Sequence, residues 1–246
     1  MAVSRIKTVR LSEQARVTIM HCKTNKFIYV HLPKCAGTFL KHFLLSKIYQ
    51  DYKANLNIYD KEHDTRGEYS LEHIVNKNKL DPKSYFKFSI IRNPWDRVVS
   101  MYNFLGGKKY DYMISSGKER ELLPPITAFH EFYLKDNFDG FVNYCFVLGK
   151  LRSFHAGYYD SYTNRLSLNG SLSVDKCYKL ENINEAVSDL SDRFNFKDSE
   201  AFTDWRKNSS AAFRNKDNYR DYYSNWSREV ISKHFLIDID NFNYSF

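Results

Sequence analysis

The stretch FIYVHLPKCAGTFLKHFLLSKIY, from Phe27 to Tyr49, constrains the fold of this chain more than any other. It opens with an apolar run, Phe27 to Val30, which predicts a buried strand bounded by Pro33 and Gly37. Beyond Gly37 the apolar residues recur at helical spacing, which predicts a helix with one buried face: Leu40, Phe43, Leu44 and Ile48. The stretch therefore predicts a strand, a short loop and a helix.

The loop between this strand and this helix, PKCAGT from Pro33 to Thr38, has the composition of an anion-binding site. Its small residues let the backbone approach a ligand closely, and the N–H groups at the start of a helix have no intrahelical partners. Lys34 adds an ammonium group. We therefore expect a phosphate or sulfate site here, although the loop lacks the GxxxxGK[ST] spacing of a Walker motif.

A second strand–helix unit, YFKFSIIRNPWDRVVSMY, follows further along the chain. Phe86 to Ile91 predicts a strand, after which Asn93 suits the N-cap and Pro94 the first helical position. Arg92 then stands at the carboxyl end of a strand, where parallel-sheet proteins bind ligands. Ser100 lies about two turns into the helix, within reach of a phosphate that Arg92 holds.

Together, HLPKCAGT and IIRNPWDRVVSMY resemble the two nucleotide-binding signatures of sulfotransferases that use 3′-phosphoadenosine 5′-phosphosulfate (PAPS). More narrowly, they resemble the carbohydrate branch, such as heparan sulfate 2-O-sulfotransferase and the Golgi chondroitin enzymes. This resemblance implies that Lys34 to Thr38 hold the 5′-phosphosulfate and that Arg92 and Ser100 hold the 3′-phosphate. Cys35 replaces a threonine of many relatives, which the loop accepts because its main contacts are backbone amides.

The carboxyl-terminal third also resembles this family. KLENINEAVSDL is similar to a family strand that ends in Glu-Asn before a helix, so Glu181 supports the fold more than the chemistry. The segment from Trp205 to Phe246 is similar to the family's end, where a loop closes over the nucleotide. The resemblance as a whole implies these donor contacts: Lys34, Cys35, Ala36, Gly37, Thr38, Phe39, Arg92, Ser100, Asn208 and Ser210.

Sulfuryl transfer needs a general base for the acceptor hydroxyl and positive charge at the leaving phosphate, which Lys34 supplies. In the carbohydrate branch the base lies between the two nucleotide motifs, so the polar segment 50–84 is the expected substrate and active-site region. His63 is the first candidate, with an ordinary loop histidine an equally good interpretation. Glu68 is an alternative, and His73 fits a packed or surface histidine better than a base.

Several local patterns complete the expected fold. The middle third, from Asn103 to Tyr159, predicts mostly helix, with aromatic stripes that belong to the core. Gly106 and Gly107 are expected to end one of these helices, and residues 110–123 to form an exposed loop. Asn182 with Glu185 predicts a capping box before an amphipathic helix.

Composition sets limits on the function. The 246 residues predict one domain over 1–246, with 1–26 as a lead-in or an extra edge strand. No apolar run is long enough for a membrane span or a secretory signal, so we expect a cytoplasmic protein. Four separated cysteines argue against a zinc site or a disulfide framework, and we expect no metal. The net charge of +8 suits polyanionic ligands, without a nucleic-acid motif.

The sequence therefore predicts a three-layer, P-loop-like α/β fold with a mainly parallel central sheet flanked by helices. It predicts a PAPS-dependent O-sulfotransferase whose acceptor is a hydroxyl, first of all on a carbohydrate and otherwise on a small-molecule natural product. Two other classes stay open. A nucleotide kinase is disfavoured by the missing Walker spacing, and a glycan-binding module by the presence of Lys34, Arg92 and Ser100.

Overall fold

A central sheet of four strands organises the computed structural model, which describes residues 21–48, 70–117, 124–196 and 216–246. Three neighbouring strands are parallel and the first is an antiparallel edge. In spatial order they are β1 (His21–Cys22), β2 (Phe27–Tyr29), β3 (Phe86–Ile91) and β6 (Lys176–Lys179). The mainly parallel sheet is as predicted, and β1 makes the end of the lead-in an edge strand.

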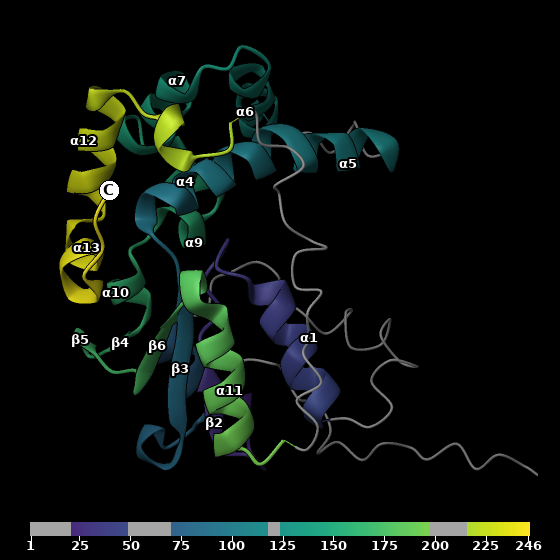
Figure 1. Ribbon diagram of the computed structural model, residues 1–246, viewed down its shortest axis with the longest axis vertical. Coiled ribbons are helices and arrows are strands. Elements are labelled where there is room, and N and C mark those ends of the chain that lie inside the picture. Colours follow the sequence, from purple (N-terminus) through teal and green to yellow (C-terminus); the bar gives the residue numbers. More distant parts are fainter. Residues whose placement is uncertain (1–20, 49–69, 118–123, 197–215) are drawn as a thin grey trace, which may run out of the picture.

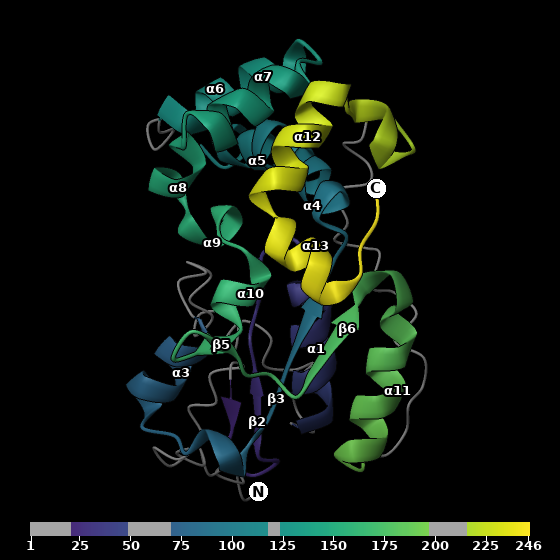
Figure 2. The same ribbon diagram turned by 90° about the vertical axis from the view of Figure 1, so that its left-hand side faces the viewer.

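The strand register gives the sheet an aromatic face. Phe27 pairs with Phe86, Tyr29 with Phe88, and Ile90 with Tyr178, so these side chains point the same way. Helices α1 (Gly37–Ile48) and α11 (Ile183–Arg193) cover this face, while α10 (Tyr162–Arg165) and α13 (Leu236–Phe242) lie on the other (Figures 1 and 2). The sheet and the helices on its two faces therefore form three layers.

A helical region with its own aromatic core stands over the carboxyl ends of the strands (Figure 1). Tyr102, Phe129, Phe141 and Phe235 are fully buried there, which confirms that the aromatic stripes are core. The region contains α4 (Pro94–Tyr102), η4 (Asn103–Lys108), α5 (Lys109–Ser115), α6 (Pro124–Leu134), α7 (Phe138–Val142), η6 (Asn143–Val147), α8 (Lys150–Phe154), α9 (Ala156–Tyr159) and α12 (Asn225–His234).

One local prediction in this region is wrong and another is wrong in part. Gly106 and Gly107 do not end a helix, because the chain continues from α4 through the π-helix η4 into α5. A Cβ on Gly106 would lie 2.5 Å from Tyr133 Cβ and 2.7 Å from the Phe129 carbonyl oxygen, so this glycine serves the close approach of α6. The expected exposed loop 110–123 begins as helix, since α5 extends to Ser115, but most of residues 110–117 are exposed as predicted, and 118–123 lie outside the described residues.

The capping box before α11 is also wrong. The Asn182 side chain makes no bond to the backbone of the first turn, and its Nδ2 instead donates to Glu185 Oε2 at 3.2 Å. The helix itself is as predicted.

Shorter elements complete the fold. They are α3 (Leu71–Asn78), η3 (Pro82–Ser84), β4 (Ser167–Leu168), β5 (Ser171–Leu172), η7 (Leu180–Asn182) and η10 (Tyr219–Tyr222). Of the expected substrate segment, residues 50–69 lie outside the described residues. Across the described ranges, no helix combines the length and apolarity that a bilayer crossing requires.

Candidate active site

The loop after β2 has an unusual backbone. Lys34 and Ala36 have φ angles of 68° and 54°, in the left-handed region that non-glycine residues rarely adopt. Left-handed residues in a tight loop turn successive N–H groups toward one side and create a concavity for an anion. Each such residue costs about 1–3 kcal/mol, which the surrounding structure must offset. The loop thus fits a phosphate or phosphosulfate group.

Gly37, the first residue of α1, fixes how the loop joins the helix. A Cβ on Gly37 would lie 1.9 Å from His31 Nε2 and 2.1 Å from His31 Cδ2, so the imidazole packs directly on the backbone there. Only glycine allows this approach. Sequence reasoning missed His31, whose signal was its position between β2 and the loop inside HLPKCAGT.

Cys35 points into the core. Its side chain is fully buried, and its thiol donates to the Pro33 carbonyl (3.7 Å) and to Tyr162 Oη (3.6 Å). Burial raises the pKa of this thiol, although the charge of Arg97 acts in the opposite direction. Cys35 therefore contributes its backbone to the loop, and its neutral thiol is no nucleophile.

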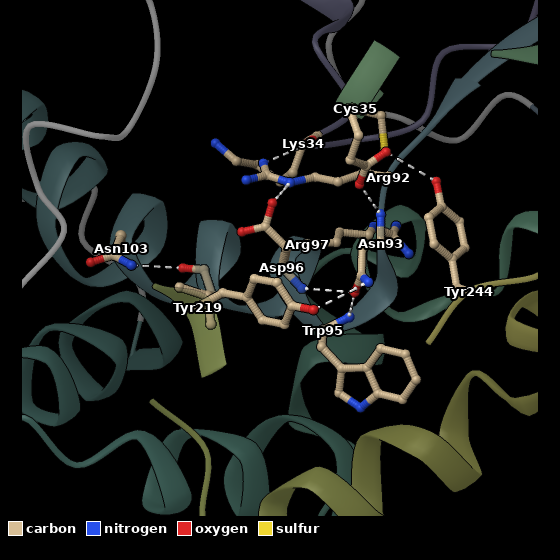
Figure 3. A network of polar contacts seen from close by, with 12 residues as sticks. Lys34, Cys35, Arg92, Asn93, Trp95, Asp96, Arg97, Asn103, Tyr219 and Tyr244 are labelled. Atoms are coloured by element: carbon tan, nitrogen blue, oxygen red, sulfur yellow. Dashed lines mark hydrogen bonds and ion pairs between the residues drawn. The ribbon is translucent and has the colours of Figure 1, made fainter. Parts of the chain in front are cut away.

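Arg92 lies at the end of β3 and joins the two sequence motifs (Figure 3). Its Nη1 donates to the Lys34 carbonyl at 3.2 Å, and its Nε pairs with Asp96 Oδ2 at 2.7 Å. Burial lowers and Asp96 raises the pKa of Arg92, with a net increase, so the guanidinium stays charged. No hydrogen bond of Nη2 is found within the described part of the chain, and its contact with a ligand phosphate stays a prediction.

The start of α4 is built as predicted. Pro94 takes the first position, and Asn93 Oδ1 accepts from the backbone N–H groups of Trp95 and Asp96. Asn93 is itself held from outside the motif: its N–H donates to Glu181 Oε1 at 2.7 Å, and its Nδ2 to the Ser245 carbonyl at 2.9 Å. These bonds agree with a structural role for Glu181.

Arg97 is a second arginine that sequence reasoning missed. It is fully buried, and it donates to the carbonyl oxygens of Pro33 (3.3 Å), Gly157 (2.8 Å) and Asp160 (3.3 Å). Its guanidinium also lies 4.7 Å from the Tyr162 ring centroid. Arg97 therefore supports the loop from its buried side. Its sequence signal was its place in RNPWDR.

The other predicted site residues are placed as follows. Lys34 is partly exposed, with its Nζ 3.9 Å from the ring centroid of Phe104. Ser100 is 2% exposed within α4, and its contact with a phosphate stays a prediction. Four predicted residues lie outside the described residues, namely His63, Glu68, Asn208 and Ser210.

His73 is an exposed residue of α3, and its backbone N–H donates to Ser70 Oγ at 3.2 Å. Figure 2 shows α3 beside the sheet and below the strand ends that carry the loop and Arg92. This position favours a surface histidine over a base.

Comparison with known proteins gives one match. The Sulfotransferase family profile covers residues 17–245 and so includes both motifs and the carboxyl-terminal helices. No significant match was found among curated proteins or solved structures. The profile covers nearly the whole sequence, and the resemblance of the two motifs is thereby confirmed. The chain belongs to the sulfotransferase family.

Proposed function

We propose that this protein is a PAPS-dependent O-sulfotransferase. The observation that carries the proposal is the contact between Arg92 Nη1 and the Lys34 carbonyl, which joins two anion-binding elements at adjacent strand ends. In the reaction, the acceptor hydroxyl oxygen bonds to sulfur while the bond from sulfur to the bridging phosphate oxygen breaks. The electron pair leaves with 3′-phosphoadenosine 5′-phosphate (PAP), and the hydroxyl proton passes to a base.

The described residues support distinct roles in this reaction. The backbone N–H groups of the loop, in a P-loop-like arrangement of strand, loop and helix, bind the 5′-phosphosulfate. The Lys34 ammonium stabilises the charge that develops on the leaving phosphate oxygen. Arg92 binds the 3′-phosphate through its remaining N–H groups, with Ser100 beside it on α4. These groups supply the positive charge, so the proposed step needs no metal.

The base is proposed from sequence alone. His63 is the first candidate and Glu68 the alternative, while the position of His73 disfavours it. Asn208 and Ser210 are proposed donor contacts on the same sequence grounds. For the acceptor we propose a carbohydrate hydroxyl, on a glycan or a glycolipid, because the motifs resemble the carbohydrate branch. A natural-product hydroxyl is second.

The decisive test is calorimetric titration with PAP, beside ATP with magnesium and ADP. We expect PAP to bind and to depend on its 3′-phosphate, because we assign the binding of that phosphate to Arg92. Arg92→Ala should weaken binding, whereas Arg152→Ala, a matched change at an exposed arginine of α8, should not. Preference for ATP would indicate a kinase. Failure to bind either nucleotide would indicate a glycan-binding module.

A further inference from the structure

The ring of Phe104 lies against the ammonium group of Lys34. The Nζ atom is 3.9 Å from the ring centroid, within the distance at which an aromatic face attracts a cation. Phe104 is half-buried at the edge of the helical core, in the π-helix η4. The extra residue in a π-helical turn changes the direction of the side chains that follow, and such turns concentrate at functional sites.

One continuous segment of chain holds Lys34 at both ends. Arg92, at the end of β3, donates to the Lys34 carbonyl at 3.2 Å. Phe104, just beyond α4, contacts the ammonium of the same lysine. The β3–α4–η4 unit therefore fixes both the backbone and the side chain of Lys34.

We propose that Phe104 is a positioning residue that holds the Lys34 ammonium at the mouth of the loop. The inference rests on the proposed sulfotransferase function. An ammonium group has three N–H donors, so a ring on one side leaves it able to donate to the bridging oxygen of the donor. Because Lys34 acts on charge that appears as the S–O bond breaks, misplacing it lowers kcat more than it raises KM for the donor.

The test compares Phe104→Leu, Phe104→Tyr and a series of mono-, di- and trifluorinated phenylalanines at position 104. Fluorine removes electron density from the ring face with little change in size, so kcat should fall stepwise along the series. We expect kcat to fall about tenfold in Phe104→Leu, with KM for PAPS within about twofold and Phe104→Tyr close to wild type. A merely structural role would not follow the fluorine series.

Phe154→Leu is the matched control, because the Phe154 ring lies 4.9 Å from Lys109 Nζ and packs on the same helical core. Its kcat should stay near wild type. A kcat that is unchanged across the fluorinated series, or a Phe104→Leu loss matched by lost PAP affinity or lost thermal stability, would overturn the positioning role.

The contact has a readout that does not need turnover. Ring-current shifts of the Lys34 side-chain NMR signals should vanish in Phe104→Leu and persist in Phe154→Leu; shifts that do not change would refute the contact. If wild-type protein neither binds PAP nor transfers a sulfuryl group, the proposed function fails, and the positioning role fails with it. If it does both and the fluorinated series is flat, only the inference fails.

Discussion

The loop from Pro33 to Gly37 and the corner from Arg92 to Asp96 both follow parallel strands, yet they present positive charge by different means. The loop does so mainly through its backbone, bent by left-handed Lys34 and Ala36, with the side chain of Cys35 turned inward. The corner does so through a side chain, since the Arg92 guanidinium is aimed by Asp96 and the Lys34 carbonyl.

This difference teaches where sequence identity matters. In the loop, the size of a side chain and the backbone conformation determine which residues fit, so a cysteine can replace a threonine. At the corner, the planar fork of the guanidinium sets the geometry, because it contacts the Asp96 carboxylate and the Lys34 carbonyl at once and is proposed to bind a phosphate as well. Lys34 is the exception within the loop, since its side chain has a proposed role in the chemistry. Four substitutions sharpen or break this comparison.

Lys34→Ala should have the largest effect. We expect kcat to fall by about 10²–10³-fold, the range for losing a group that stabilises transition-state charge. PAP affinity should change far less, because the loop amides and Arg92 remain. Lys150→Ala, at an exposed lysine of α8, is the control. Turnover that persists in Lys34→Ala would refute the role of this lysine.

Gly37→Ala should come next, through geometry alone. The new Cβ would meet the His31 ring at 1.9–2.1 Å, so the ring or the loop must move. We expect PAP affinity to fall at least tenfold, measured by calorimetry, because misplaced amides no longer converge on the phosphosulfate. Gly117→Ala is a useful contrast: its φ is +68° with nothing within 4 Å, so it should cost stability without changing PAP affinity. Equal PAP binding in the two variants would argue against a backbone-built loop.

Arg92→Lys keeps the charge and removes the fork. We expect about tenfold weaker PAP binding, since a lysine cannot contact Asp96, the Lys34 carbonyl and a phosphate in the same geometry. Adenosine 5′-phosphosulfate, which lacks the 3′-phosphate, should bind both proteins alike. An equal loss of affinity for both ligands would mean that Arg92 organises the loop without binding the 3′-phosphate.

The smallest effect concerns Cys35 and pH. Burial raises the pKa of its thiol above the ordinary 9.0, so the folded state keeps a proton that the unfolded state loses. The stability from this thiol is therefore complete below pH 9.0 and declines above it, by at most about 1.4 kcal/mol per pH unit. Urea unfolding from pH 7 to 10 should show a steeper loss for wild type than for Cys35→Ser. Identical slopes of unfolding free energy against pH for the two proteins would mean that the thiol is exposed to solvent.

Local chemistry made much of this structure predictable. Apolar periodicity identified the strands and helices around both motifs, and the Asn93–Pro94 pair identified the start of α4. The meeting of Lys34 and Arg92 followed from two strands ending at one edge of a parallel sheet.

The misses share a physical cause. Arg97 and Phe104 matter because of partners 64 and 70 positions away in the chain, which no local pattern reports. Gly106 was misread because a glycine looks the same in sequence whether it ends a helix or lets another helix approach.

The bond between Asn93 Nδ2 and the Ser245 carbonyl spans 152 positions of the chain, and the Phe246 ring packs on Trp95 beside it. The start of α4 is therefore completed only by a segment that is synthesised 152 positions later. While the ribosome still holds that segment, Arg92 and its neighbours lack part of their final support. Contacts of this span slow folding, so nascent chains should acquire nucleotide affinity only after Ser245 and Phe246 emerge.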